Sequence, residues 1–575
     1  MPLTGPASAI IATSSHAISP SVEAVDLAAR HGAVELTRTG PRGQRLWVIG
    51  LPVVLEGSLD AMLDRAVGSD VRIARQMLTA LDGAFTAFWW DPDARRLLVV
   101  NDFAGLQPIY MRKFAGRVAF APRIDTLAGG DVTADAAGWG GFVGFGNFIG
   151  ERTSVAGVTR IPPATVVEYD AASDTVSSSS YWRWPSMSAN LTLDKVDTGE
   201  LLDLIDATLR AYEIYGRTPT LLLSGGFESR LLAALLTRAG RSPSALTLRN
   251  PYEHMEIDGR FASRVARTLR LRHVIRDPDP QFFSTPRYLD YVRGHEVAST
   301  SVNLFIAQVA SELQEAGVEA IWDGFPYGCM TKEKSAESFD EFIGHMMKPA
   351  DGPAWRAAQQ VFAPSFVEEM RVSLDEAVRR EIEACHPAPH GTQQFFQRNR
   401  IRHRIAPNTL KVYAGFLSPF LPGLAKAVYE RIVPIPPSQR KGEALYFRIF
   451  ERHFPELAKI PWCSGGHLFP GTRRGPGYRA IQARSAVVEH PRVGNLLRRF
   501  HFVASRQQPS CVGDAVHTAA LDDRCLNADG IRALQRSAPI GTNSDTFARE
   551  LVFYWSMWRS VMCAAPSAAV CSSAA

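Results

Sequence analysis

The chain has 575 residues, of which 46% are hydrophobic and 21% are charged. This balance is typical of a folded globular protein and excludes a disordered one. The length exceeds one ordinary hydrophobic core, so we expect two large domains. The net charge of +5 comes from 63 Lys and Arg against 58 Asp and Glu. An excess this small gives no reason to expect a nucleic-acid partner.

Seven cysteines are scattered along the sequence without a Cys-X-X-Cys pair. The sequence therefore indicates neither a zinc site nor a disulfide framework, and isolated thiols are typical of a reducing compartment. The first residues lack a basic stretch followed by an apolar one, and no run of about 18 apolar residues occurs. We therefore expect a cytoplasmic protein without a secretory signal or a membrane span.

The first 190 residues are rich in short segments typical of β-strands, with turn signals between them. The segments are RLWVIGLPVVL, AFTAFWWD, RRLLVVND, PIYMRKF, RVAFAP and TVVEYD. Closely spaced strands of this kind predict a mostly antiparallel, layered α+β domain over residues 1–190. The serine run at residues 177–180 is interpreted as the start of a linker to the next domain.

Residues 191–575 show longer helical periods, and strands alternate with helices. The segment TPTLLLSGGFESRLLAALLTRAG predicts a buried strand, a Gly-Gly turn and a helix, and further strands are predicted in SALTLRN, RHVIRDP and EAIWDGF. Alternating strands and helices imply a parallel sheet with helices on both faces and ligands at the carboxyl ends of the strands. Beyond Tyr327 we expect a largely helical chain.

The turn in LLLSGGFESR carries the clearest chemistry. A strand that ends in Ser-Gly-Gly and enters a helix places open backbone N–H groups at the positive end of a helix dipole, which suits a phosphate or pyrophosphate. Gly225 and Gly226 permit the turn. Ser224 and Ser229 supply hydroxyl groups, and Glu228 is a candidate magnesium ligand. The alternative is an ordinary strand-to-helix turn capped by serine.

This turn resembles the Ser-Gly-Gly-X-Asp-Ser loop of the PP-loop ATP pyrophosphatases, and other motifs resemble the asparagine synthetase family in the same order. LDGAFTAFWWD, NDFAGLQPIYM and VAFAPRIDTL are similar to motifs of its glutamine amidotransferase domain. GFLSPFLPGLAKAVYERIVPIPPSQRKGEALYFRIFERHFPELAKIPW is similar to its Pro-Phe-Leu-Asp, Lys and Arg, and Leu-Pro-Glu elements. The resemblance implies a class II amidotransferase-like, Ntn-hydrolase-like domain over residues 1–190. A PP-loop synthetase domain that uses ATP and Mg²⁺ would occupy residues 191–575.

Departures from the family pattern limit what the resemblance implies. Class II amidotransferases hydrolyse glutamine with an N-terminal cysteine, whereas this sequence begins Met-Pro and has no cysteine before Cys329. We therefore expect no glutaminase activity. Glu228 replaces the metal-binding aspartate of the turn and keeps its charge one methylene group farther out. In the second metal-binding loop Gly328 replaces the other aspartate, which leaves Asp323 as the carboxylate.

The family also uses a lysine that stabilises charge as pyrophosphate leaves. In the corresponding segment, FPELAKIPWCSGG, Trp462 and Cys463 stand near the expected position. Lys441 and Arg473 are our candidates for this catalytic role, set against the ordinary explanation that an exposed helical lysine is solvated surface.

Other charged residues have ordinary explanations. Glu256 and Asp258 open a helix where the family places acidic residues near the nucleotide, but a helix N-terminus itself favours negative charge. The basic segment at 398–411 is interpreted as a solvated helix face, with a surface for an acidic peptide or a phosphate as the alternative. His273 and His403 have no metal-ligand spacing and are interpreted as structural.

In the asparagine synthetase family a substrate carboxylate attacks the α-phosphate of ATP, and an amine then attacks the activated carbonyl. Without the glutaminase cysteine, the resemblance implies an amine that is already on a substrate, as in β-lactam synthetases and lasso peptide cyclases. We prefer the second, with a precursor peptide as substrate and a protease as a further partner. The alternatives are amidation of a small-molecule carboxylate with free ammonia, and a scaffold that keeps the fold without catalysis.

Overall fold

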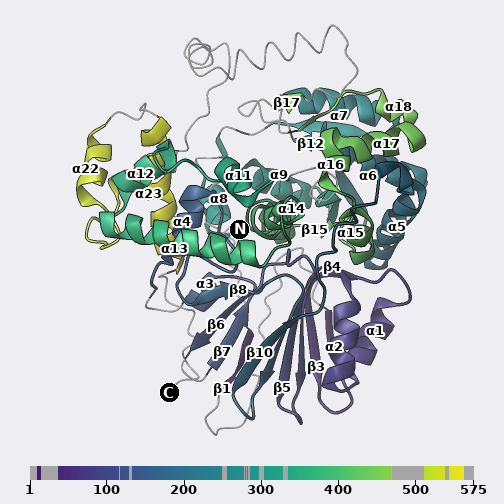
Figure 1. Ribbon diagram of the computed structural model, residues 1–575, viewed down its shortest axis with the longest axis horizontal. Coiled ribbons are helices and arrows are strands. Elements are labelled where there is room, and N and C mark those ends of the chain that lie inside the picture. The colour runs from purple at the N-terminus through teal and green to yellow at the C-terminus, as the bar shows by residue number, and fades with distance from the viewer. Residues whose placement is uncertain are drawn as a thin grey trace.

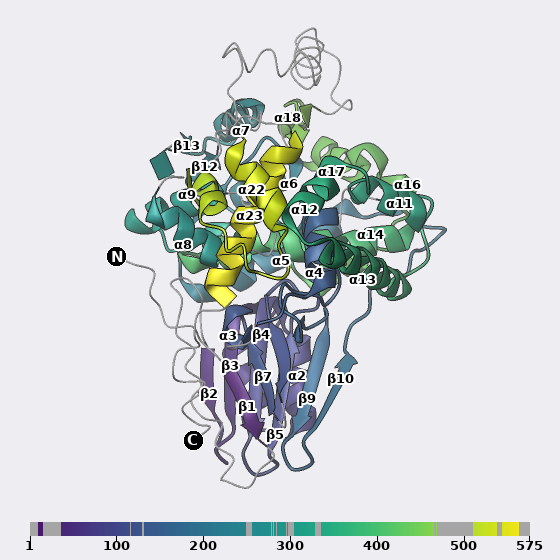
Figure 2. The same ribbon diagram turned by 90° about the vertical axis from the view of Figure 1, so that its left-hand side faces the viewer.

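A computed structural model describes residues 10–14, 36–114, 117–128, 132–248, 256–277, 279, 281–282, 285–294, 296, 304–327, 335–464, 467–468, 510–537 and 543–562. The molecule has a strand-rich part, formed by the described residues up to Ser180, and a larger helical part that surrounds a second sheet (Figure 1, Figure 2). No helix among these residues is long and apolar enough to cross a membrane.

The strand-rich part consists of two stacked antiparallel sheets, as the sequence predicts. The six-stranded sheet has the order β10-β9-β5-β4-β3-β2, and the four-stranded sheet has the order β1-β7-β6-β8. The strands are β1 (Ile10–Ser14), β2 (Leu36–Thr39), β3 (Arg45–Val53), β4 (Asp82–Asp91), β5 (Arg96–Asn101), β6 (Tyr110–Phe114), β7 (Arg117–Ala121), β8 (Val158–Arg160), β9 (Thr165–Asp170) and β10 (Thr175–Ser180).

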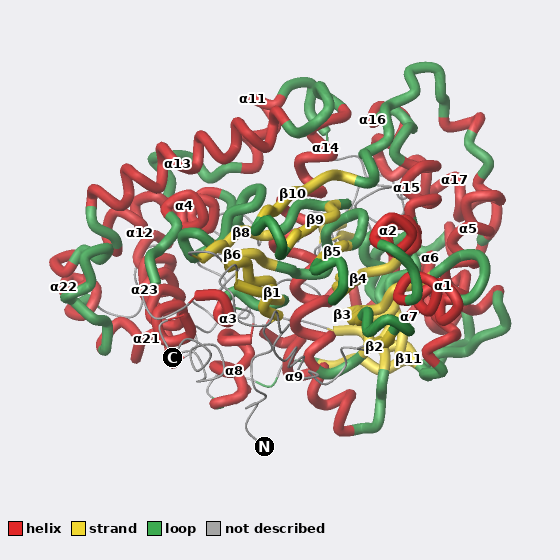
Figure 3. The backbone as a smooth tube through the Cα atoms, turned by 90° about the horizontal axis from the view of Figure 1, so that it is seen from below, coloured by secondary structure: helices red, strands yellow, loops and turns green. Residues whose placement is uncertain are grey.

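Strand β3 shows why this part has three layers. Leu46 and Val48 pack in the cluster beneath helices α1 (Leu59–Val67) and α2 (Val71–Ala80), whereas Trp47 and Ile49 pack between the two sheets. Successive side chains of a strand point to opposite faces, so a continuous apolar run must be covered on both sides. The six-stranded sheet is therefore the middle layer, and Figure 3 shows α1 and α2 on its outer side.

The second sheet is parallel throughout, with the order β13-β12-β11-β14-β15. Its strands are β11 (Pro219–Leu222), β12 (Ala245–Leu248), β13 (His273–Arg276), β14 (Ala320–Trp322) and β15 (Ser418–Phe420). Leu221 and Ala245 pack against α6 (Phe227–Arg238), whereas Leu246 packs on the opposite face against Val309 of α9 (Leu304–Glu315). The predicted parallel sheet with helices on both faces is confirmed. Strand β15 was missed because three residues show no period.

Most of the other described helices of eight or more residues follow β14 in the chain. They are α4 (Ala136–Gly144), α5 (Thr198–Ala211), α7 (Glu256–Thr268), α8 (Pro286–Gly294), α11 (Phe339–Met346), α12 (Pro353–Val361), α13 (Pro364–Glu383), a π-type helix (Gln397–Ile405), α17 (Ala444–His453), α21 (Ser510–His517), α22 (Ala528–Arg536) and α23 (Asn543–Met562). Shorter helices are α3 (Asp125–Ala128), α14 (His390–Phe396), a second π-type segment (Asn408–Val412), α15 (Lys426–Ile432), α16 (Pro437–Arg440) and α18 (Pro455–Ala458).

The serine run at residues 177–180 forms the last four residues of β10, which corrects its interpretation as a linker. It pairs antiparallel with β9, down to Ser180 opposite Thr165. Serine is tolerated there because β10 lies at the edge of its sheet and its side chains are largely exposed. The connection to the helical part begins at Tyr181.

Helix α4 joins the strand-rich part to the helices of the second part. All nine of its residues are buried. A Cβ atom on Gly140 would lie 2.5 Å from the carbonyl oxygen of Met370 in α13, so glycine permits the close approach of these two helices. Trp139 packs against Trp555 of α23, with ring centroids 4.7 Å apart. Figure 3 shows α4 beside α12, α13 and α23. The division near residue 190 stays a prediction.

The basic segment at 398–411 is buried at the same junction, which corrects the expectation of a solvated helix face. Arg402 is 1% exposed, and its guanidinium donates to the carbonyl oxygens of Gly105 at 3.1 Å, Gly150 at 3.2 Å and Ile161. Arg160 donates in turn to the carbonyl oxygen of Arg402 at 2.8 Å. These positive charges therefore hold the two parts of the chain together and do not face solvent.

His403 belongs to this network as a neutral ring. Its Nε2 atom lies 2.8 Å from the carbonyl oxygen of Gly150 and donates to it, and its Nδ1 atom accepts from Arg160 Nη1 at 3.4 Å. Burial, together with the charges of Arg160 and Arg402, holds the pKa of His403 well below its ordinary value. The expectation that His403 is structural agrees with these contacts.

Replacing Arg402 with Ala should lower the free energy of unfolding by about 3 kcal/mol, because three buried hydrogen bonds to carbonyl groups are lost. The carbonyl group of Ile161 loses the donor it has in Arg402, whereas those of Gly105 and Gly150 keep a second donor in Arg160 and His403. Urea denaturation measures the change. Arg380→Ala is the matched control, since Arg380 is exposed on α13 and its side chain pairs with the exposed Glu376; it should change stability by less than about 0.5 kcal/mol. Equal effects of the two substitutions would contradict the assignment.

The neutral ring of His403 predicts a pH dependence. Below the ordinary histidine pKa, the ring of His403 binds a proton in the unfolded chain but not in the folded protein. The free energy of unfolding therefore falls as the pH drops below 6.5. In His403→Gln the amide keeps a donor for Gly150 and an acceptor for Arg160 but does not titrate. Denaturation between pH 6.5 and 5.5 should show a slope that is smaller by up to about 1.4 kcal/mol per pH unit in this variant. An unchanged slope would show that His403 is protonated in the folded state.

Candidate functional site

The Ser-Gly-Gly turn lies where the sequence places it, at the carboxyl end of the middle strand of the parallel sheet. Strand β11 ends at Leu222, and α6 begins at Phe227 with Gly226 as its N-cap. The N-cap makes no side-chain hydrogen bond to the first turn of the helix. A helix that starts at this edge without a side-chain cap has the arrangement that binds anionic ligands in parallel sheets.

The amides of the turn find acceptors inside the protein. The N–H of Ser224 donates to Ser229 Oγ at 2.9 Å, and the N–H of Gly226 donates to Ser224 Oγ at 3.2 Å. The N–H of Gly225 donates to Asp258 Oδ1 at 2.8 Å. The sequence predicts open amides here, and the structure differs because two hydroxyl groups and a carboxylate reach them. A phosphate at this turn would have to displace these acceptors or use the first amides of α6.

A segment from the C-terminal part covers the turn. The N–H of Cys463 donates to the carbonyl oxygen of Gly225 at 3.3 Å, and its Sγ atom donates to Asp258 Oδ1 at 3.3 Å. A Cβ atom on Gly225 would lie 2.6 Å from that sulfur, so only glycine fits. Trp462 stacks on Phe227 with ring centroids 4.5 Å apart. Burial raises the pKa of Cys463, which therefore stays a thiol.

Arg230 holds the turn and its covering segment together. The side chain is fully buried, and burial lowers the pKa of Arg230 to about 9, so it is charged at neutral pH. Its guanidinium donates to the carbonyl oxygens of Ile460 (2.8 Å), Pro461 (2.8 Å), Gly225 (3.2 Å) and Leu457 (3.3 Å). Sequence analysis missed Arg230. The available signal was an arginine directly before the apolar helix run LLAALL, where a charge needs partners.

Asp258 also plays a part that the sequence did not predict. It is 3% exposed and accepts from both Gly225 and Cys463, so it is not a solvated charge at a helix N-terminus. The sequence could not show that Asp258 lies between the turn and the covering segment, because Gly225, Asp258 and Cys463 are each more than thirty residues apart. The distance in sequence between Gly225 and Asp258 alone is 33 residues.

The two predicted magnesium ligands influence each other. Asp323 follows β14, and its carboxylate accepts from the N–H of Phe325 at 3.0 Å and from Thr409 Oγ1 at 2.7 Å. Burial raises the pKa of Asp323, these hydrogen bonds oppose the rise, and the charge of Glu228 adds to it. A Cβ atom on Gly324 would lie 2.8 Å from the backbone nitrogen of Ser229, so the loop after β14 packs directly on the start of α6.

The structure relates the remaining candidate site residues less directly to the turn. Lys441 is exposed in the short turn Lys441–Glu443 before α17, a helix that packs on α6 through Tyr446 and Phe227 at 5.3 Å. Its catalytic role stays a prediction. Arg473, Gly328 and the side chain of Glu256 lie outside the part of the chain that the structure describes.

Replacing Arg230 with Met keeps the length of the side chain but removes four donors, so the segment over the turn should loosen. Cys463, which is fully buried, should then be alkylated in the folded protein at least about ten times faster. Alkylation of each cysteine is measured by mass spectrometry at one fixed pH. Arg238→Met, at an exposed position of α6, is the control and should leave Cys463 protected. Equal protection in both variants would contradict the role of Arg230.

Comparison with known proteins concerns the strand-rich part. A family model described as a glutamine amidotransferase domain matches residues 70–182, which extend from α2 to the end of β10 and the first residues after it. No match was found among curated proteins. The chain therefore contains a glutamine amidotransferase-like domain.

Two solved structures also show similarity. Glutamine phosphoribosylpyrophosphate amidotransferase from B. subtilis, complexed with ADP and GMP, is 12% identical with a TM-score of 0.17, over 51% of this chain and 64% of that one. An allosteric regulatory enzyme of purine biosynthesis is 10% identical with a TM-score of 0.20, over 55% of this chain and 83% of that one. Both TM-scores are too low to support an inference about the rest of the molecule.

Proposed function

We propose that the protein is an ATP-dependent amide synthetase that activates a carboxylate and joins it to an amine carried by its substrate. The observation that supports this best is the Ser-Gly-Gly turn at the carboxyl end of β11, packed against the loop that carries Asp323. A glutamine amidotransferase-like domain precedes this site in the chain. The proposed domain arrangement is residues 1–190 for the amidotransferase-like domain and 191–575 for a synthetase domain of the asparagine synthetase type.

The residues present fit ATP and Mg²⁺ in part. Glu228 and Asp323 would hold the ion, because the charge of the first raises the pKa of the second and a cation between them would relieve that repulsion. Among the described residues no group of three or more His, Cys, Asp and Glu side chains is placed to hold a metal ion. Mg²⁺ often takes only one or two carboxylates and completes its shell with phosphate oxygens and water, so in this proposal the pair would bind the ion together with the phosphates.

The chain's own side chains have distinct roles in this proposal. ATP would supply the leaving group that makes the carboxylate reactive. Ser224, Gly225, Gly226 and Ser229 would bind its phosphates, with the uncapped start of α6 behind them. Arg230 is a positioning residue that keeps Trp462 and Cys463 over the turn and water away from its base. Lys441 and Arg473 are the proposed sources of positive charge for the departing pyrophosphate.

The amine is proposed to come from the substrate. The sequence has no cysteine before Cys329, so the amidotransferase-like domain offers no thiol for the attack on glutamine. The narrower form of the proposal is macrolactam formation on a precursor peptide, as in lasso peptide cyclases, in the cytoplasm and with a protease as partner. The alternative reaction is amidation of a small-molecule carboxylate with ammonia.

A non-catalytic scaffold is the second candidate function, and one observation favours it. Asp258 occupies the N–H of Gly225, and its negative charge disfavours a phosphate at the same place. The metal-binding aspartate that the family places at position 328 is also missing, since the sequence has Gly328.

Exchange of labelled pyrophosphate into ATP tests the synthetase directly, with peptides that carry Asp or Glu and with small carboxylic acids as substrates. Exchange should fall by roughly tenfold to a hundredfold in Glu228→Gln and in Asp323→Asn, because the ion loses a charged ligand. Asp323→Asn keeps an acceptor for Phe325 and so preserves the loop. Glu368→Gln, at an exposed position of α13, should retain full exchange.

The outcomes separate the candidate functions. If the parent protein exchanges pyrophosphate and Glu228→Gln does not slow the exchange, the reaction takes place at another site. If no carboxylate supports exchange, the non-catalytic scaffold is the remaining candidate function. If exchange occurs, loss of one water from a precursor peptide by mass identifies the cyclase. Added glutamine should release no glutamate in any of these reactions.

A further inference from the structure

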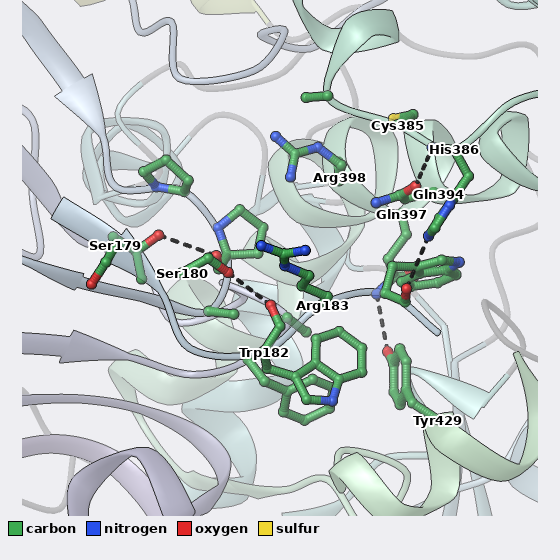
Figure 4. A pocket seen from close by; sticks show the side chains of 18 of the residues that line it. Ser179, Ser180, Trp182, Arg183, Cys385, His386, Gln394, Gln397, Arg398 and Tyr429 are labelled. Carbon is green, nitrogen blue, oxygen red and sulfur yellow. Dashed lines mark hydrogen bonds between the residues drawn. The ribbon is translucent and has the colours of Figure 1, made fainter. Parts of the chain in front are cut away.

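A cavity of about 630 Å³ lies away from the Ser-Gly-Gly turn, between the connection after β10 and the region from α13 to the π-type helix (Figure 4). The polar side chains at its base are closed off, since Tyr429 is 0% exposed and Gln397 is 3% exposed. This cavity therefore offers a ligand few contacts. The outer face of α7 differs, because its charged side chains are open to solvent.

Helix α7 carries a row of arginines on its outer face. Its apolar residues Ala262, Val265 and Ala266 pack in the core of the helical part. The exposed residues on the other side are Arg260, Arg264 and Arg267, and Arg270 follows the end of the helix and is exposed as well. Spacings of four and three residues place the first three arginines on one face of the helix.

The positive charge of this segment is not balanced from within. Between residues 259 and 276 the sequence contains six arginines and neither Asp nor Glu. Arg264, Arg267 and Arg270 make no hydrogen bond or ion pair with any described residue. Three neighbouring guanidinium groups that face solvent without an acidic partner produce a positive potential over this face.

Acidic side chains on the adjoining elements do not cancel that potential. Helix α18 packs on α7, but its Glu456 pairs with Lys459 at 2.7 Å. Glu312 of α9 lies 3.9 Å from Arg276, beyond the end of the row. The next acidic residue in the chain, Asp277, also follows the row. The exposed arginines of α7 are therefore available to an anionic partner from outside the described part of the chain.

The row of arginines starts beside the candidate synthetase site. Asp258, two residues before Arg260, accepts from the N–H of Gly225 at 2.8 Å. Burial lowers the pKa of Arg230, and the charge of Arg264 lowers it further, so this charge is felt beneath the turn. From Arg260 the helix rises by about 1.5 Å per residue, and Arg267 lies about 10 Å farther along the axis. A chain bound along this row would have one end near the turn.

The residues around the row favour a peptide over a nucleic acid. Proteins that bind single-stranded nucleic acids usually stack bases on exposed aromatic rings. Between residues 259 and 276 the only Phe, Tyr or Trp is Phe261, which is 6% exposed. Guanidinium groups bind carboxylates through paired hydrogen bonds, and Glu or Asp side chains of an extended peptide can match arginines that are spaced along a helix.

We propose that the outer face of α7 binds an acidic stretch of a peptide and that this peptide extends to the Ser-Gly-Gly turn. Carboxylates of the peptide would accept from Arg264 and Arg267, and Arg270 would hold a carboxylate farther from the turn. The assignment names the substrate class of the proposed amide synthesis and rests on it, but the binding itself requires no ATP. Because the arginines are exposed, the binding should weaken in salt.

Fluorescence anisotropy of the full chain without ATP tests the surface, with a short fluorescein-labelled peptide of alternating Glu and Gly as the probe. The same peptide with Gln in place of Glu should bind at least about tenfold more weakly, because it offers no carboxylates. Raising NaCl to about 0.5 M should weaken the Glu peptide by about tenfold or more.

Two double variants locate the surface. Arg264→Gln combined with Arg267→Gln should weaken the Glu peptide about tenfold. Arg379→Gln combined with Arg380→Gln removes the same charge from an exposed part of α13 and should leave the affinity unchanged. All four positions are exposed, so both variants should keep the circular dichroism and melting temperature of the parent protein.

Four results would overturn the proposal: no saturable binding of the Glu peptide up to about 1 mM, equal binding of the Gln peptide, equal affinity in the two double variants, or tighter binding of a single-stranded oligonucleotide than of the Glu peptide. Pyrophosphate exchange is measured separately. Peptide binding without exchange would keep the peptide surface and reject the synthesis, whereas exchange without peptide binding would keep the synthesis and reject the surface.

Discussion

The architecture depends on one buried contact, in which the guanidinium of Arg402 reaches three backbone carbonyl groups of the strand-rich part. Removing a charge from water is unfavourable, and these acceptors, together with the charges of Glu381 and Glu151, compensate it in part. The same segment continues to Thr409, which donates to Asp323, and to Lys411, whose ammonium group pairs with the buried Glu296. A single stretch of chain thus connects the amidotransferase-like domain to the candidate metal site.

These contacts fix the positions of the two parts of the chain relative to each other. Glu296 pairs with Lys411 and also accepts from the backbone of Ile124, at the start of α3 in the strand-rich part. The segment over the Ser-Gly-Gly turn is held by Arg230, which donates to the carbonyl oxygens of Ile460 and Pro461. Buried arginines therefore position both the junction of the two parts and the segment over the turn. Burial and the charge of Glu228 raise the pKa of Asp323, whose carboxylate accepts from Phe325 and Thr409.

The sequence predicted the elements that have a strong period and little else. Strands β3 and β4 and helix α6 follow from apolar runs of the right length, and the parallel sheet follows from their alternation. The place of the Ser-Gly-Gly turn between β11 and α6 was predicted, but not the contacts of Gly225 with Asp258 and Cys463. Those partners lie far away in sequence, and local patterns contain no information about them.

The incorrect interpretations share a physical cause. The serine run was taken for a linker because polarity marks both linkers and exposed edge strands, and only the pairing of β10 with β9 distinguishes them. The basic segment was taken for solvated surface because charge is usually exposed. Arg402 is buried because carbonyl groups at Gly105 and Gly150 accept from it, and a sequence does not show where such carbonyl groups will lie.

Helix α4 has a consequence for how such a chain can evolve. Its glycine-rich surface fits against α13, and Trp139 lies among the aromatic rings of α23, so deleting the amidotransferase-like domain would uncover an apolar groove in what remains. Retention of the domain is thereby favoured by solubility alone, independently of any reaction that it catalyses.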